Sequence, residues 1–466
     1  MGWLSGKLRL RLAEATRNTP VVEAVHRVTW RKVDARRVSM DKLRHAENLR
    51  TRAERIRRHV LERLPDYLEQ FVTQATAGGA CVHFAPDATA ADRIICEIAR
   101  SRGLRLAVKS KSMTTEEVRL NDALAAADVR VVETDLGEFI VQIDHDRPSH
   151  IISPIIHKDR RQIAGAMARE LGCAYTEDPE ELTSIARRHL RDIFRRCDLG
   201  ITGVNFAVAE TGTLCLLTNE GNGRMTVTRP RVHVALLGIE KIIPRLTDLP
   251  VFLKLLARSS TGQAMGAYTT LITGPKRSAD RDGPEELHIV LLDNGRSDIL
   301  AGPVPEVLHC VRCGACLNAC PVYRNIGGHA YNSVYPGPIG SLLTPLLWGP
   351  SHEELPRVSS LCGACRLACP VKIDIPELLV RLRSLATDRQ PRIKRWLLRG
   401  WAWGMNRAWR YRLGQRLMRR TLSDDGSGWA TRGLGPLRDW TGQRDLPRPG
   451  ARSFRQLWQE DLGDER

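Results

Sequence analysis

Hydrophobic residues follow two different periodicities along the first 300 residues of the chain. In residues 1–75 apolar residues recur at helical spacing among many arginines, as in AENLRTRAERIRRHVLERLPDYLEQFV, which predicts a basic helical region. In residues 76–300 short apolar runs alternate with helical patterns. Alternation of this kind predicts an α/β layered domain with a largely parallel sheet.

The apolar runs and helical patterns of residues 76–300 predict individual strands and helices. The expected strands are ACVHFA, LRLAVKS, VRVVETD, EFIVQI, RVHVALLG, LHIVLLD and two pieces of GVNFAVAETGTLCLLTN broken at Glu210–Gly212. The expected helices are ATAADRIICEIARSRG, TTEEVRLNDALAAAD and PEELTSIARRHLRDIFRRC. Thr114 and Glu117 have the spacing of a capping box at the start of the second helix.

The pattern changes again after residue 300. Residues 301–380 are rich in glycine, proline and cysteine and show little periodicity. Residues 381–466 form a basic, tryptophan-rich region: thirteen Arg and Lys stand against one acidic residue in 381–420, and seven of the ten tryptophans follow position 395. The sequence therefore predicts four regions with boundaries near 75, 300 and 380.

The overall charge and hydropathy limit the classes of protein to consider. The chain has 466 residues and a net charge of +18, with no apolar run of 18 residues and no secretory signal, so we expect a cytoplasmic protein. The basic, tryptophan-rich region suits peripheral contact with the inner face of an anionic membrane, or an acidic partner subunit. A solvated helical face that packs its tryptophans on the cysteine-rich region explains it equally well. Without a recognised nucleic-acid-binding fold, we expect no nucleic-acid partner.

Two copies of one cysteine motif dominate residues 301–380. CVRCGACLNACP at 310–321 and SSLCGACRLACP at 359–370 are identical at seven of twelve positions. The motifs contain seven of the chain's 12 cysteines, a crowding that indicates metal ligation in a cytosolic protein. The other five, which we expect to be mostly small buried side chains, are Cys81, Cys96, Cys173, Cys197 and Cys215.

The spacing C-x2-C-x2-C-x3-C-P is that of ferredoxins with two [4Fe–4S] clusters, in which the fourth cysteine of each run binds the other cluster. The first cluster is thus expected on Cys310, Cys313, Cys316 and Cys369, and the second on Cys320, Cys362 and Cys365. A pair of zinc sites fits poorly, because zinc prefers well-separated sets of four ligands.

Ser359 stands where the second motif lacks a cysteine. The fourth position of the second cluster is therefore open to the serine oxygen, water, a substrate atom, another side chain, or loss of one iron to give a [3Fe–4S] cluster. The sequence alone does not choose among these.

Loops of the α/β domain supply further candidates. Lys109 and Lys111 in KSKSMTT, with the amides of a helix N-terminus, suit a carboxylate or phosphate, or else form a solvated basic turn. The loops 210–213 and 219–225 either line a ligand cleft or serve only as turns. No Rossmann or Walker motif occurs in the sequence, so we expect the two-electron chemistry to belong elsewhere.

Several long motifs together resemble one family. CVRCGACLNACPVY and SSLCGACRLACPVKIDIPELL, with VKSKSMTTEEVRLNDAL, ETDLGEFIVQI, SHIISPIIHKDRRQI and ITGVNFAVAETGTLCLLTNEGNGRM upstream, resemble the lactate utilisation protein B family of bacterial lactate operons. The resemblance covers roughly residues 70–380 and, more weakly, the basic C-terminal segment.

The resemblance implies a fold and a function. It implies that the α/β domain is similar to sugar-phosphate isomerases and folate-cyclising enzymes, and that a mostly helical dicluster ferredoxin domain follows it. It also implies an electron-transfer subunit in a multi-subunit system that oxidises L-lactate to pyruvate, so that lactate serves as a carbon source. The alternative is an enzyme that acts directly on a small carboxylic acid in the α/β domain, with the substrate at the open iron of the second cluster.

Overall fold

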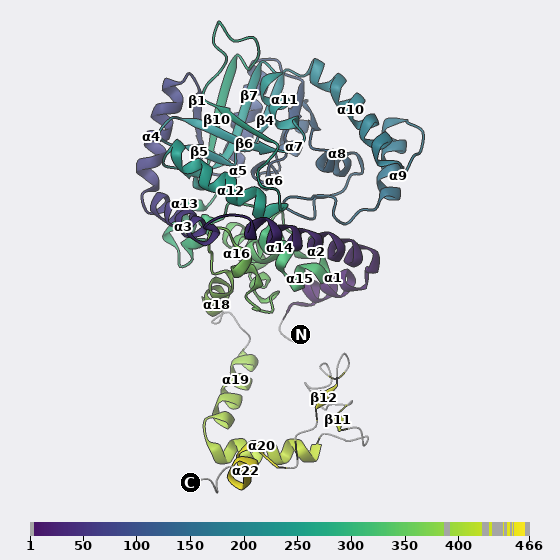
Figure 1. The fold of residues 1–466 in the computed structure, drawn as a ribbon, viewed down its shortest axis with the longest axis vertical. Coiled ribbons are helices and arrows are strands. Elements are labelled where there is room, and N and C mark those ends of the chain that lie inside the picture. Colours follow the sequence, from purple (N-terminus) through teal and green to yellow (C-terminus); the bar gives the residue numbers. More distant parts are fainter. Residues whose placement is uncertain are drawn as a thin grey trace. The chain divides into compact units, whose positions relative to one another are not determined.

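The computed structural model describes residues 4–385, 392–421, 428–430, 441, 445–447, 450 and 452–461. The chain divides into two units, the larger of which spans residues 4–385 (Figure 1). The smaller contains the described residues from 392 onward. Among the described residues, no helix combines the length and the apolar character needed to cross a bilayer.

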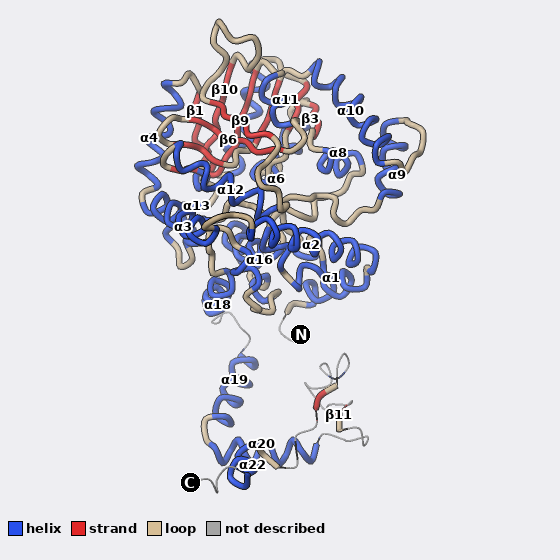
Figure 2. Tube along the Cα trace, in the orientation of Figure 1, coloured by secondary structure: helices blue, strands red, loops and turns tan. Residues whose placement is uncertain are grey.

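A six-stranded sheet forms the centre of the larger unit, and every neighbouring pair of its strands is parallel (Figure 2). In spatial order the strands are β1 (Cys81–Ala85), β10 (Glu286–Leu292), β7 (Val232–Gly238), β4 (Leu199–Thr202), β2 (Leu106–Lys109) and β3 (Arg130–Glu133). β7 and β4 are buried on both faces, which explains their nearly unbroken apolar sequences. The predicted α/β domain with a parallel sheet is confirmed.

Different layers cover the two faces of this sheet. On one face, α5 (Ala88–Ser101) and α7 (Leu120–Ala126) pack on alternate strand residues such as Val234 and Leu236. The opposite face is covered partly by a four-stranded sheet of β8 (Ile242–Ile243), β5 (Phe206–Val208), β6 (Thr213–Thr218) and β9 (Tyr268–Ile272). The strands β5 and β6 flank 210–212, where the sequence predicts a break.

Helices complete the remaining layers. Over β2 and β3 lie α8 (Leu136–Ile143), α9 (Arg160–Leu171) and α10 (Pro179–Arg196). The other helices of this part are α6 (Met113–Glu117), α11 (Asn222–Thr228), α12 (Leu249–Ser260) and α13 (Arg296–Ala301), with short 3₁₀ turns η1 (Ile239–Lys241) and η2 (Leu246–Asp248).

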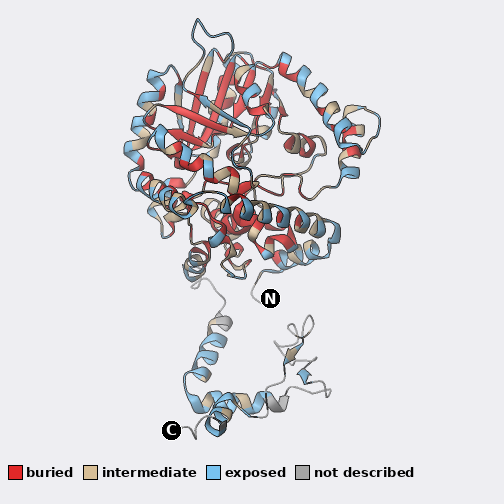
Figure 3. Ribbon diagram, viewed as in Figure 1, coloured by how far each residue is buried: buried red, intermediate tan, exposed pale blue. Residues whose placement is uncertain are grey.

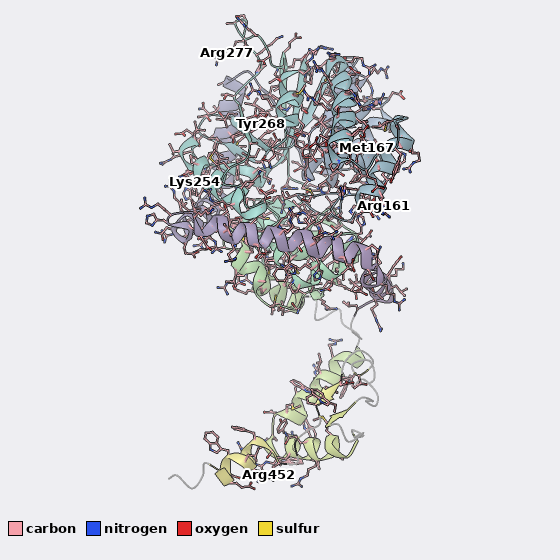
Figure 4. The ribbon with its side chains drawn as sticks, turned by 45° about the vertical axis from the view of Figure 1, so that its right-hand side comes forward. Arg161, Met167, Lys254, Tyr268, Arg277 and Arg452 are labelled. Carbon is pink, nitrogen blue, oxygen red and sulfur yellow. The ribbon has the colours of Figure 1, made fainter. Side chains whose placement is uncertain are left out.

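The N-terminal region is helical, as predicted. It consists of α1 (Gly6–Arg17), α2 (Thr19–Asp41), α3 (Ala46–Glu62) and α4 (Leu64–Ala77). The long helix α2 contacts α12 of the α/β part and also α14 (Ala315–Ala319) and α15 (Pro321–Ile326) of the cysteine-rich part. Figures 1 and 4 both show α2 running between these two parts. The helix therefore joins them into one unit.

Two predicted elements are wrong. EFIVQI is not a strand but the end of α8, whose first turn is capped by the Asp135 carboxylate accepting from Gly137 N at 3.0 Å. The helix expected at 114–128 is interrupted at Arg119, where φ is +58°, and becomes α6 and α7. Its N-cap is Ser112, which accepts from Thr115 N, so the capping box expected at Thr114 does not form.

The smaller unit contains two arginine-rich helices, α19 (Arg392–Met405) and α20 (Ala408–Thr421). Most described side chains of these helices are exposed (Figure 3). The remaining described elements are the short antiparallel pair β11 (Trp429–Ala430) and β12 (Leu446–Pro447), and α22 (Phe454–Asp461).

Candidate metal centre

The two cysteine motifs fold into the same local shape. Each runs through a loop into a glycine at positive φ, Gly314 at +73° and Gly363 at +83°, and then into a short helix. A residue without Cβ adopts this conformation without strain, which explains both glycines. The two helices, α14 and α17 (Ala364–Ala368), contact each other. Around them lie η3 (Pro305–His309), α16 (Gly337–Trp348), η4 (His329–Tyr331), η5 (Gly349–His352), η6 (Leu355–Arg357) and α18 (Ile375–Leu385).

Four cysteines from both motifs line a single cavity. They are Cys310, Cys313 and Cys316 of the first motif and Cys369 of the second. Cys313, Cys316 and Cys369 are buried and Cys310 is half-buried. Cys369, the fourth expected ligand of the first cluster, therefore lines the same cavity, although it comes 53 positions after Cys316 in the sequence.

The thiols of this group perturb one another. Burial, together with the neighbouring Cys369 and Cys310, raises the pKa of Cys313 to about 12. Burial and its cysteine neighbours also raise the pKa of Cys316 well above the usual range. Thiolates so close together need a cation between them, because their charges repel in a buried environment.

The remaining three cysteines form a second group. Burial and the nearby Cys320 and Cys362 together raise the pKa of Cys365 to about 12. Cys320 and Cys365 are buried, whereas Cys362 is exposed. Cys316 also lies close enough to Cys365 for their charges to interact. The two groups are therefore neighbours, and the second reaches the surface of this unit.

The donor chemistry of both groups fits iron–sulfur clusters. Backbone N–H groups point at three of the sulfurs: Arg312 N at Cys310 (3.4 Å), Tyr323 N at Cys320 (3.4 Å) and Ile373 N at Cys369 (3.3 Å). Hydrogen bonds of this kind stabilise thiolate charge and influence the reduction potential of a bound cluster. Zinc sites are usually separate sets of four ligands, unlike these adjoining groups of four and three thiols.

Ser359 lies in the second motif with its side chain turned toward its own loop. It is half-buried, and its Oγ accepts a hydrogen bond from Leu361 N at 3.2 Å. The same loop position in the first motif is held by Cys310, one of the cavity-lining cysteines.

A buried network of charged side chains joins the first cysteine loop to the α/β domain. Arg296 binds both carboxylate oxygens of Glu117, at 2.8 and 2.9 Å, and also binds Glu240 at 2.6 Å. Arg312 Nη2 lies 3.4 Å from Glu240, and its guanidinium stacks 4.7 Å from the ring of Tyr335. Although burial raises the pKa of Glu240, the charges of Arg296 and Arg312 bring it down to about 2. The carboxylate is therefore ionised, and it anchors the cysteine loop.

Lys109, at the end of β2, and Lys111, in the loop after it, form neither an open anion site nor a solvated basic turn. Lys109 is fully buried and pairs with Glu133 at 2.7 Å and Glu116 at 3.0 Å, so it is not available to an anion. Lys111 pairs with Glu138 at 2.8 Å but also lines a cavity, which loop 219–225 borders and loop 210–213 does not.

The five isolated cysteines follow the expectation only in part. Cys197 and Cys215 are buried, Cys96 and Cys173 are half-buried, and Cys81 is exposed. Cys81 begins β1 at the edge of the sheet, where one side of the strand faces solvent.

Comparison with known proteins agrees with this architecture. The LUD domain matches residues 68–292, the 4Fe-4S dicluster domain 306–373, and the C-terminal domain of lactate utilisation protein B 382–462. A protein from Bacillus cytotoxicus called lactate utilization protein B is 44% identical over 90% of each chain. Another of that name, from Shouchella clausii, is 46% identical over 88% of this chain and 87% of its own.

The chain belongs to the lactate utilisation protein B family. The resemblance expected from the sequence is thus confirmed, and the dicluster match supports iron–sulfur clusters in this family member. A solved DUF162 family protein from Deinococcus radiodurans covers 49% of this chain and 98% of its own, with 14% identity and a TM-score of 0.28, too low to transfer any property.

The sequence did not identify the charged groups around the first cysteine loop of this family member. Glu240 and Lys241 lie in the 3₁₀ turn η1, which follows the buried strand β7, and Arg312 lies inside the motif itself. A charged pair just after a largely apolar strand is a signal that points to the carboxyl edge of a parallel sheet. Arg296 and Glu117 gave no comparable signal, because their partners are far away in the sequence.

Proposed function

We propose that this chain carries electrons in the oxidation of L-lactate to pyruvate, as the iron–sulfur subunit of a multi-subunit complex that lets lactate serve as a carbon source. The relatives' name and the dicluster match support a role in lactate utilisation. The observation that carries the electron-transfer role is the arrangement of seven cysteines in two adjoining groups.

The cysteines have distinct roles in this proposal. Cys310, Cys313, Cys316 and Cys369 hold the first cluster, and Cys320, Cys362 and Cys365 hold the second. Two bound [4Fe–4S] clusters supply two one-electron carriers, matching the two electrons released when one L-lactate becomes pyruvate.

Burial gives the two groups different positions along an electron path. The first group is mostly buried, while Cys362 of the second is exposed. Electron exchange with another protein needs a close approach, which the exposed group permits. The second group is therefore proposed as the contact with a partner subunit.

The basic helices α19 and α20 provide a candidate dock. The exposed fractions of Trp396, Trp401 and Trp403 are 72%, 62% and 61%, and no acidic residue occurs in 392–421. Arginine with exposed tryptophan is typical of helices that bind the surface of an anionic membrane. We propose that this segment binds the inner face of the cytoplasmic membrane, with an acidic partner subunit as the competing outcome.

Reduction of the chain within its complex tests the electron-transfer role. Complex isolated anaerobically from cells grown on lactate should lose visible iron–sulfur absorbance when L-lactate is added, with a matching electron paramagnetic resonance signal. The purified chain alone, given L-lactate and an artificial acceptor, should show no turnover. Turnover by the chain alone would instead support the alternative, direct action on a small carboxylic acid.

A further inference from the structure

A cavity of about 340 Å³ lies beside the carboxyl ends of β2 and β4. The loops that leave these strands, residues 110–112 and 203–205, both line it. The two strands are neighbours in the sheet, but the chain continues from β2 to β3 on one side and from β4 to β7 on the other. In open parallel sheets, ligands bind in the crevice where strand connections diverge in this way.

Two buried cationic residues line this cavity, and each has a side-chain nitrogen without a hydrogen-bond partner among the described residues. Lys241 is 8% exposed, and its Nζ has no hydrogen bond or ion pair with any residue in the described part of the chain. Arg312 is 9% exposed, and its Nη1 is buried without a hydrogen-bond partner among the same residues. A buried donor left without an acceptor costs stability, so Arg312 Nη1 points to a missing anion, and the unpaired ammonium group of Lys241 lines the same cavity.

Positive charge exceeds negative charge around these two residues. Four cations there, Arg57, Arg296, Arg312 and Lys241, face the two carboxylates of Glu117 and Glu240 and the sulfur of Cys310. The acidic residues of the cavity lie near Lys111 instead, since Asp135 and Glu220 both interact with the group around that lysine. Lys32 adds another cation from α2 and donates to Ser153.

The cavity adjoins the first group of cysteines. Ile151 and Arg312 line both this cavity and the one that Cys310, Cys313, Cys316 and Cys369 surround. No residue of the second motif lines it. An anion held by Arg312 would therefore lie next to the first expected cluster, not at the open position of the second.

We propose that this cavity binds a small 2-hydroxy or 2-oxo carboxylate, whose carboxylate group is held by Lys241 and Arg312. Amide side chains in the lining, such as Asn205 and Asn222, suit the neighbouring hydroxyl or oxo group. The choice of this acid class rests on the proposed function, whereas the presence of an anion site rests on the unpartnered cations.

Isothermal titration calorimetry tests the site directly. Anaerobically purified full-length protein with its clusters is titrated with L-lactate, pyruvate and inorganic phosphate. Wild type should bind the two carboxylates more tightly than phosphate. Lys241→Gln should weaken carboxylate binding by about tenfold or more, because it removes a charged hydrogen bond. Lys254→Gln, the same charge change at an exposed position of α12 (Figure 4), should bind as wild type does.

A second variant shows whether weakened binding is specific to the Lys241 substitution or is shared by another cation of the cavity. Lys32→Gln changes a different element, α2, and should also weaken binding. Iron content and visible absorbance measured on every variant show whether the clusters are intact.

Three results would overturn the proposal: no carboxylate binding by wild type, equal or tighter binding of phosphate, or wild-type affinity in an iron-replete Lys241→Gln protein. In the last case, a shifted reduction potential would show that the lysine only balances thiolate charge. Lactate-dependent reduction of the wild-type complex is scored separately, so the electron-transfer role can stand when the cavity assignment fails.

Discussion

Ser359 occupies the position in the second cysteine motif that Cys310 occupies in the first. Leu361 N donates to Ser359 Oγ at 3.2 Å, as Arg312 N donates to Cys310 Sγ at 3.4 Å. The donor residues also share a left-handed conformation, with φ of +56° and +59°. The repeat in the sequence is thus a repeat in backbone geometry at this loop, where Cys310 and Ser359 differ only in the sulfur or oxygen atom that accepts the hydrogen bond.

This equivalence predicts the effect of restoring the thiol. A serine hydroxyl is a weaker iron ligand than a thiolate and must lose a far less acidic proton. Brief exposure of wild type to air should therefore convert one cluster to a three-iron form, visible by electron paramagnetic resonance. Ser359→Cys should suppress that signal.

Ser360→Cys is the matched control, because its side chain is exposed and its position has no counterpart among the cysteines of the first motif. It should show the wild-type three-iron signal. If wild type gives no such signal, or Ser359→Cys gives it unchanged, Ser359 is not the weak position.

The proposed exchange of ligands between the two motifs predicts which substitutions act alike. Cys369→Ala should abolish the same cluster signal as Cys313→Ala, since both residues line the first cavity although they come from different motifs. Cys320→Ala should instead act like Cys365→Ala. Cys81→Ala, at an exposed cysteine outside both groups, should leave iron at about eight per chain. Loss of the same signal in Cys369→Ala and Cys365→Ala would show that each motif serves a single cluster.

Local patterns were sufficient to predict most of the α/β region. The strands β7 and β10 follow from largely apolar runs, and the helix α5 from its periodicity and the glycine after it. The segment 138–143 failed because Phe, Ile and Val are typical of strands, while the cap at Asp135 and packing on α9 favour a helix. A short apolar run does not distinguish these outcomes by itself.

The site was predictable where its residues belong to a recognisable motif, even though Cys369 lies 53 positions after Cys316. Motif spacing predicts both cysteine groups, because the cluster chemistry fixes how the fourth cysteine is shared. In the charged network, Arg296 pairs with Glu240, 56 positions away, and with Glu117, 179 positions away. No local sequence signal indicates such pairings. Lys109 resembled an anion-binding residue, but its charge is neutralised by Glu133 on the neighbouring strand.

The network around Arg296 should dominate the stability of the larger unit. Arg296→Met removes the shared partner of Glu117 and Glu240 and leaves two buried carboxylates poorly compensated. Breaking a buried pair in this way costs about 3–5 kcal/mol of unfolding free energy. Denaturant unfolding followed by circular dichroism measures the loss. Arg195→Met, which breaks an exposed pair with Asp192, should cost less than about 1 kcal/mol, and equal losses would contradict the prediction.

Carboxylate binding should weaken at alkaline pH. Burial and the charge of Arg312 lower the pKa of Lys241 to about 8, while Glu240 and Cys310 oppose them and Arg57 adds to them. The anion binds the protonated lysine, so affinity should be constant below pH 7 and fall as pH rises through 8. Calorimetry between pH 6 and 9 measures this trend. Because burial also lowers the pKa of Lys32 to about 8, Lys241→Gln should keep a shallower decline, and a rise in affinity with pH would contradict the assignment.

The arginine-rich helices α19 and α20 should hold the protein on anionic membranes. Their exposed tryptophans suit the interface, and their arginines supply attraction to anionic lipid. Full-length protein should sediment with vesicles that contain anionic phospholipid but not with purely zwitterionic vesicles. Removing residues 386–466 should abolish this binding and leave the iron content intact, because every motif cysteine lies within residues 4–385.

Salt and point substitutions separate the electrostatic contribution of the arginines from the apolar contribution of the tryptophans to membrane binding. Raising salt from 0.1 M to 1 M shortens the Debye length from about 10 Å to about 3 Å, so binding should weaken strongly. Arg395→Gln should reduce binding at low salt, whereas Arg195→Gln, an exposed arginine of α10, should not. Trp401→Ala should reduce the part that survives high salt, because the ring contributes apolar contact instead of charge. If the full-length protein does not sediment with anionic vesicles but needs residues 386–466 to co-purify with its complex, the segment binds a partner subunit and the membrane assignment is wrong.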